Sequence, residues 1–192
     1  MHPRTPLVVA LLALWAAAAP AAAQSRPEVI VAVGGTTAIQ GAQGGGVTAA
    51  LTLQWPLADH VRFGLTGFLD DLGDRTGRLR DPQGQDLGPV SVLHQAAKGA
   101  AWRTEAYTAW GRRYEGFATM NWGVYRVRDD VRGTLIRRTN APGVAVGVGL
   151  LRSVTATHAL GLEVRYQQLW RGVVQRYLSA AAEWRWRRSE GN

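Results

Sequence analysis

The sequence predicts an all-β chain in which eight antiparallel strands close into an up-and-down barrel. Three observations support this fold class: apolar and polar residues alternate through long segments, polar connections separate the segments, and no useful helical period occurs after the N-terminal residues. The clearest alternation lies at 159–187, which reads as a hairpin. In its first strand Leu160 and Leu162 share one face, whereas Glu163 and Arg165 share the other.

Eight segments alternate in this way, and the connections between them follow a rule. The segments are 28–35, 47–55, 61–69, 101–111, 114–127, 143–151 and the two strands of the hairpin at 159–187. The even-numbered connections are short and lie at 56–60, 112–113 and 154–158. Three of the four odd-numbered connections are long and lie at 36–46, 70–98 and 128–142. Alternate connections of an up-and-down barrel lie at opposite ends, so the pattern predicts short inner turns and long outer loops.

The first residues are typical of an export signal. Arg4 lies in a short positive region, residues 7–19 are apolar, and small residues precede a cleavage site near Ala23. We therefore predict three parts. They are a signal peptide at 1–23, an outer-membrane β-barrel domain at 24–188 and a short C-terminal tail at 189–192.

Composition excludes several classes of protein. The 192 residues include no Cys, which rules out disulfides, a thiol enzyme and a Cys-ligated metal. The net charge of +8 favours phosphate-rich partners such as lipid or polysaccharide. Nucleic acid is not expected, because the arginines alternate with Glu inside strands and form no unbroken basic stripe.

Strand parity leaves open which face looks outward. A soluble barrel would bury the apolar face, and a membrane barrel would expose it to lipid. The strands are about 9 to 13 residues long, close to the 9 to 11 that cross a bilayer. The apolar face also carries Trp near strand ends, as in an aromatic girdle. The girdle residues are Trp55, Trp110, Trp184 and Trp186 at the inner rim and Trp102 and Trp170 at the outer rim. These features favour a transmembrane barrel.

In that orientation a set of charges faces the lumen. The set comprises Arg62, Arg103, Glu105, Glu115, Glu163, Arg165, Glu183 and Arg185. Six of them form Arg/Glu pairs two residues apart on one strand, and buried charges without partners are costly. We therefore predict a structural ion-pair network that plugs the lumen. A gated polar pore or a proton path is the alternative.

The GLEVRYQQL strand at 161–169, the final WRW at 184–186, the export signal and the alternating connections resemble small outer-membrane β-barrel proteins of the OmpA/OmpX type. The resemblance implies a monomer in the bacterial outer membrane, placed there by the barrel-assembly machinery and in contact with membrane lipid and lipopolysaccharide. It implies no cofactor or metal. One departure is the end of the chain, where residues 187–192 follow the last aromatic instead of an aromatic ending the strand.

We expect a structural or surface-interaction role, carried by the outer loops at 70–98 and 128–142, and no enzymatic activity. A narrow channel or carrier for small, possibly hydrophobic, molecules is the alternative. A lipid A-modifying enzyme is a weaker hypothesis, because only Ser91 and His94 lie on the outer side and His60 and His158 fall in inner turns.

Overall fold

A computed structural model of the protein describes residues 27–39, 45–80, 83–131, 134–171 and 173–187. Side chains are described throughout these ranges except at 75–80, 89–93, 171 and 173–174. The signal peptide expected at 1–23 and the tail expected at 189–192 lie outside the described residues.

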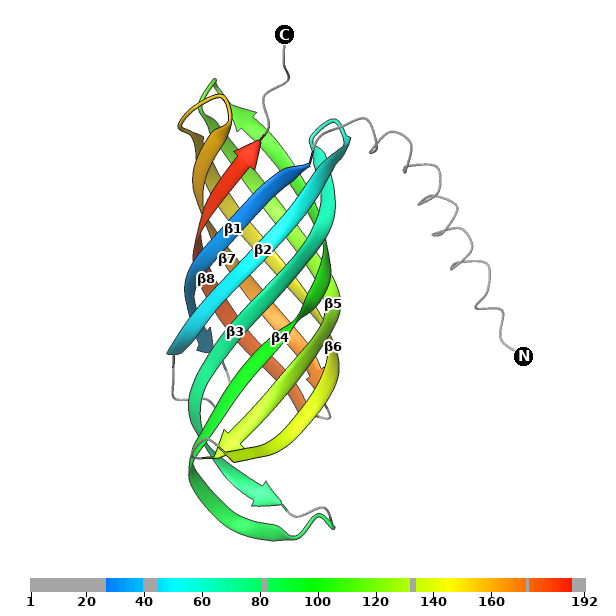
Figure 1. The fold of residues 1–192 in the computed structure, drawn as a ribbon, viewed down its shortest axis with the longest axis vertical. Helices are drawn as coiled ribbons and strands as arrows, with labels where there is room; N and C mark the ends of the chain where they lie inside the picture. Colours follow the sequence, from blue (N-terminus) through cyan, green and yellow to red (C-terminus); the bar gives the residue numbers. More distant parts are fainter. Residues whose placement is uncertain (1–26, 40–44, 81–82, 132–133, 172, 188–192) are drawn as a thin grey trace, which may run out of the picture.

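Eight strands form one closed sheet in which every neighbouring pair is antiparallel, so the predicted fold class is confirmed (Figure 1). In chain order the strands are β1 (Glu28–Ala38), β2 (Gly45–Ala58), β3 (Val61–Arg80), β4 (Asp86–Trp110), β5 (Tyr114–Val131), β6 (Thr134–Ser153), β7 (His158–Arg171) and β8 (Val173–Arg187). β1 pairs with β8, from Glu28 opposite Arg187 to Ala38 opposite Tyr177, and this seam closes the barrel.

The register fixes the size and tilt of the barrel. A path from Glu28 across successive ladder partners returns to β1 at Ala38, ten residues further along. The path passes through Gln54, Gly64, Arg103, Asn121, Ala145, Gln167 and Tyr177. With eight strands, usual strand spacing and usual rise, a stagger of ten residues tilts the strands by about 40°. Such a barrel is just wide enough for side chains to fill its interior.

The charged face points inward and the apolar face outward. Leu162 on β7 and Val148 on β6 are 67% and 64% exposed, whereas Glu163 and Arg165, which have the opposite parity to Leu162 on β7, are 1% and 3% exposed. Successive residues of a strand point to opposite sides, so one choice of face orients a whole strand. The prediction that the apolar face lies outside is therefore confirmed.

The connection at 70–98 differs from the long loop that we predicted. β3 continues to Arg80 and β4 begins at Asp86, so most of this segment is a paired ribbon that extends beyond the barrel wall and bends (Figure 1). Bulges interrupt its register at three places, beginning at Asp71/Gly73, and Gly73 adopts a φ of 74°. Bulges bend and twist a strand, which explains the curl of the ribbon.

The connection at 128–142 is also mostly strand and not the predicted loop. β5 runs to Val131 and β6 begins at Thr134, with Arg128 opposite Arg138 in the ladder. The prediction failed for a physical reason. Beyond the apolar band of the barrel, neither face of a paired strand has to be apolar. Its sequence therefore lacks the alternation of apolar and polar residues that identified the other strands.

The connections at the other end are as short as predicted. Asp59 and His60 join β2 to β3, and His60 has a φ of 64°. Gly111, with a φ of 66°, begins the turn from β4 to β5, where glycine avoids the strain that a Cβ would bring. Figure 1 shows both ends of the barrel sequence, the start of β1 and the end of β8, at this same end. We call it the terminal end and the opposite one the hairpin end.

Candidate functional site

The half of the lumen nearest the terminal end is filled by charged side chains. Five arginines and five glutamates meet there, from β1, β3, β4, β5, β7 and β8. They are the eight charges predicted from the sequence, Arg62, Arg103, Glu105, Glu115, Glu163, Arg165, Glu183 and Arg185, together with Glu28 and Arg187. We call these ten residues the ionic plug.

The centre of the ionic plug is the contact between Arg185 on β8 and Glu105 on β4. Arg185 donates from Nη1 to Glu105 Oε1 at 2.7 Å and from Nη2 to Glu105 Oε2 at 2.9 Å. It also reaches Glu183 Oε2 from Nη2 at 2.8 Å. Both Arg185 and Glu105 are 0% exposed. A bidentate arginine–carboxylate pair of this kind fixes orientation as well as charge.

Arg103 connects the centre to the far wall. Its guanidinium lies 3.0 Å from Glu105, 3.2 Å from Glu163 and 3.3 Å from Glu183. Thr119 donates a hydrogen bond of 2.6 Å to Glu163. Each glutamate thus has more than one donor, as a buried carboxylate requires.

The ionic plug ends in a second set of pairs at the terminal rim. Arg62 binds Glu115 through two nitrogens, at 2.6 and 2.9 Å, and Arg187 binds Glu28 at 2.7 Å. The Arg62 guanidinium also lies over the ring of Tyr107, 3.7 Å from its centroid. Stacking of this kind favours a cation where it is shielded from water.

Sequence reasoning missed four members of this site. Glu28 and Arg187 stand at the first and last positions of the barrel strands. Their parity was available as a signal, since Arg187 follows Glu183 and Arg185 at steps of two. Gln54 donates to Glu28 at 2.6 Å, and the ring of Phe117 lies 4.4 Å from the Arg185 guanidinium carbon. Both share the inward parity of their strands, but neither carries a charge that would have marked it as a member of the ionic set.

The half of the lumen nearest the hairpin end contains a cluster of apolar and tyrosine side chains beside buried polar groups. These residues, which we call the apolar plug, are Phe68, Leu72, Ala97, Ala101, Tyr125, Val127, Ala141, Leu169 and Tyr177. Tyr125, Val127 and Leu169 are 0% exposed, and the rings of Phe68 and Tyr125 lie 4.3 Å apart. The sequence analysis did not predict this cluster.

The two tyrosine hydroxyls of the apolar plug and the nearby Asp70 are hydrogen-bonded. Asp70, which we had placed in an outer loop, is 3% exposed and accepts from Thr48 at 2.6 Å and from Tyr177 at 3.1 Å. Gln167 donates to the Tyr125 hydroxyl at 3.1 Å. The hydroxyls of Tyr125 and Tyr177 therefore bond to the polar groups of this half, while their rings pack among its apolar side chains.

Five of the six predicted girdle tryptophans lie near strand ends on the outer surface. Trp55, Trp110, Trp184 and Trp186 lie toward the terminal end, and Trp170 lies at the hairpin end of β7. Trp102 is different. It lies opposite Leu65 and Trp122, away from either end of β4, because β4 begins much earlier in the chain than the sequence suggested.

The histidines considered for catalysis lie in different parts of the barrel, with His60 and His158 at the terminal end and His94 in the ribbon formed by β3 and β4. His94 donates a 2.9 Å hydrogen bond from Nδ1 to the Asp74 carboxylate at an exposed position, and the side chain of Ser91 lies outside the described residues. In the part of the chain that the structure describes, no three His, Cys, Asp or Glu residues are grouped as metal ligands. Within the same ranges, no helix is long and apolar enough to cross a membrane.

Comparison with solved structures identifies the fold. Neisserial surface protein A matches with a TM-score of 0.60 and 13% identity, over 84% of this chain and 96% of that one. The N-terminal β-barrel domain of Pseudomonas aeruginosa OprF matches with a TM-score of 0.52 and 10% identity, over 85% and 100%.

The outer membrane protein OprG from the same bacterium matches with a TM-score of 0.51 and 12% identity, over 85% of this chain and 98% of that one. No protein-family model matches the sequence, and no curated protein is similar to it. The chain therefore has the fold of the small eight-stranded outer-membrane β-barrels.

Proposed function

We propose that the protein is a closed barrel of the bacterial outer membrane, exported with cleavage near Ala23, that acts as a structural and surface-interaction protein without catalytic activity. The observation that carries this proposal is the filled lumen. Arg103, Arg185 and Glu105 are 2%, 0% and 0% exposed in one half, and Tyr125 and Leu169 are both 0% exposed in the other. In this proposal the two plugs in series close the lumen to ions.

Electrical recording tests the closed lumen. The purified wild-type protein in planar bilayers is expected to give no steady conductance. A double variant, Glu105→Ala with Arg185→Ala, should remain closed, because the apolar plug is intact. Adding Leu169→Ala and Tyr125→Ala should produce steady current steps. Steady steps from the wild type would instead support a narrow channel.

The membrane position rests on the outward apolar face. Leu162 is 67% exposed and lies opposite Ala182 in the ladder, whereas the next residue, Glu163, points inward and is 1% exposed. Leu162→Arg should lower the free energy of unfolding in vesicles by about 2 to 4 kcal/mol. The matched variant Leu160→Arg, closer to the terminal rim, should cost about 0 to 1 kcal/mol. Equal effects at the two sites would contradict a membrane-spanning wall.

The surface role is assigned to the β3–β4 ribbon, the longest extension beyond the wall. Asp74 and His94 are ladder partners, so residues 75–93 can be replaced by Asn-Gly, which favours a tight hairpin turn. Cells that display this shortened protein are expected to lose binding to arrays of host-surface glycans and proteins. Heat-dependent gel mobility should stay unchanged, as for a control with Asn-Gly at 155–156 in an inner turn.

A further inference from the structure

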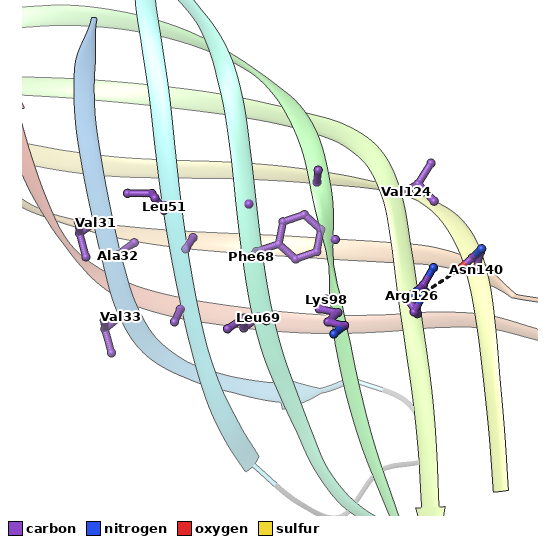
Figure 2. A pocket seen from close by; sticks show the side chains of 15 residues that line it. Val31, Ala32, Val33, Leu51, Phe68, Leu69, Lys98, Val124, Arg126 and Asn140 are labelled. Carbon is purple, nitrogen blue, oxygen red and sulfur yellow. Dashed lines mark hydrogen bonds between the residues drawn. The ribbon is translucent and has the colours of Figure 1, made fainter. Parts of the chain in front are cut away.

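A hollow of about 770 Å³ lies on the outer wall, across β1 to β6 (Figure 2). Its floor and sides are apolar and include Val31, Leu51, Leu69 and Val124. Figure 2 shows Lys98, Arg126 and Asn140 on three successive strands beside these apolar side chains. An apolar surface bordered by cations on one side is complementary to a lipid, whose acyl chain is apolar and whose headgroup is anionic.

Small residues create the hollow. Gly67 lies opposite Leu51 on one side and Ala100 on the other, so two neighbouring strands present almost no side chain outward. A Cβ added at Gly67 would have no atom within 4 Å. The depression is therefore open on its outer side, and a side chain there would fill it without disturbing the barrel.

The cations beside the hollow oppose one another directly. Lys98 on β4 is the ladder partner of Arg126 on β5, and Arg128 on β5 is the ladder partner of Arg138 on β6. Like charges directly opposite each other destabilise a sheet. An anion bound between the two pairs would remove that repulsion.

Nearby acceptors neutralise only part of this charge. Asp130 lies 2.6 Å from Arg128, and Asn140 accepts from Arg126 at 3.3 Å without contributing charge. Asp71 lines the surface beside the hollow together with Lys98 and Arg126, and its carboxylate lies 3.6 Å from His94 Nε2. Within the described ranges, Lys98 and Arg138 form no ion pair. Asp71 and Asp130 offset part of the charge of Lys98, Arg126, Arg128 and Arg138, and the cluster keeps a net positive charge.

We propose that this face binds a membrane lipid whose headgroup carries two phosphates. Its acyl chain would lie in the hollow over Gly67 and Ala100, and its phosphates between the cation pairs. Three adjacent strands span about 10 Å, which is wider than one phosphate and suits a headgroup with two. The proposal rests on the membrane position proposed above, and the hairpin-end location places the lipid in the leaflet opposite the chain termini.

The test measures lipid retained by the full mature protein after extraction from phosphatidylcholine vesicles that contain bisphosphorylated lipid A. Retention is read by native mass spectrometry. The variant Lys98→Gln with Arg126→Gln should retain about 25-fold less, at about fivefold per cation. The control Arg113→Gln with Arg152→Gln removes the same charge at the terminal end and should retain as much as the wild type. Equal retention by all three proteins would overturn the proposal.

A second variant separates lipid binding from simple attraction of phosphate. Gly67→Leu fills the hollow and leaves every cation in place, so it should reduce retention of the lipid several-fold without changing heat-dependent gel mobility. Retention unaffected by this variant would show that the hollow holds no acyl chain. A last experiment uses vesicles with phosphatidylglycerol, which carries one phosphate. If the protein retained phosphatidylglycerol as strongly as the bisphosphorylated lipid, a two-phosphate headgroup would be contradicted. Flotation with the vesicles reports insertion separately, so failure of the membrane proposal is distinguishable.

Discussion

The two halves of the lumen fill the same narrow space with opposite chemistry. The ionic plug holds ten charges in pairs, with Arg185 and Glu105 at its centre, whereas the apolar plug packs Leu169, Val127 and two tyrosines. A charge inside the barrel needs partners from several strands at fixed distances, but an apolar side chain needs only a matching shape. The ionic half therefore depends on a few specific pairs, and the apolar half depends on packing spread over many contacts.

The largest effect is expected from removing one partner in the ionic plug. Glu105→Ala removes the shortest carboxylate contact of Arg185 and one of the contacts of Arg62, both 2.7 Å. The free energy of unfolding in vesicles should fall by about 3 to 5 kcal/mol, measured by urea titration with gel mobility as readout. The double variant Glu105→Met with Arg185→Met should recover much of the loss, because paired apolar replacements remove the unpartnered charge. Failure of this rescue would mean that the plug is held by shape, as in the other half.

The next effect concerns the apolar plug. Leu169→Ala opens a cavity beside Tyr125 and should cost about 3 kcal/mol in the same titration. Leu169→Met keeps the volume and should cost less than about 1.5 kcal/mol. A similar cost for both replacements would show that this half does not depend on packing.

A smaller effect is expected where the ionic plug leaves no room for a methyl group. A Cβ at Gly147 would lie 2.6 Å from Arg165 Cγ and 2.7 Å from both Glu163 Oε1 and Thr119 Oγ1. Gly147→Ala should therefore destabilise the barrel by about 1 to 3 kcal/mol. Gly67→Ala, where a Cβ meets nothing, is the matched control and should be neutral or slightly stabilising. Equal stability of the two variants would argue against tight filling of the ionic half.

The smallest effect tests the polar contacts of the apolar plug. Tyr177→Phe removes the hydroxyl that donates to Asp70 at 3.1 Å and should cost about 1 kcal/mol. Tyr166→Phe removes a 3.3 Å bond to Gln168 on the partly exposed outer side and should change nothing measurable. If Tyr177→Phe lowered the free energy of unfolding as much as Glu105→Ala, the two halves would depend on the same kind of interaction.

The sequence predicted the ionic half better than the apolar half. Arg103, Glu105, Glu163, Arg165, Glu183 and Arg185 alternate with apolar residues, and charges on a periodic face are conspicuous. Leu169 and Val127 also point into the lumen. From the sequence alone, an apolar residue at an inward position cannot be distinguished from an outward one in a strand whose register has shifted by one residue. The hairpin-end strands were missed for a related reason, since Asp70 and Gly73 suggested a loop where the backbone still pairs.

The seam between β1 and β8 has a consequence for the rate at which the barrel opens and forms. Its strands are the first and last of the chain, so the seam can close only after the six intervening strands are in place. Until β8 arrives, Glu105 lacks Arg185 and Glu28 lacks Arg187, which means that the ionic plug is completed in the final assembly step. The same pairs must break first on opening. Interactions made only at that step slow unfolding without accelerating folding, so the last strand gives the barrel kinetic persistence.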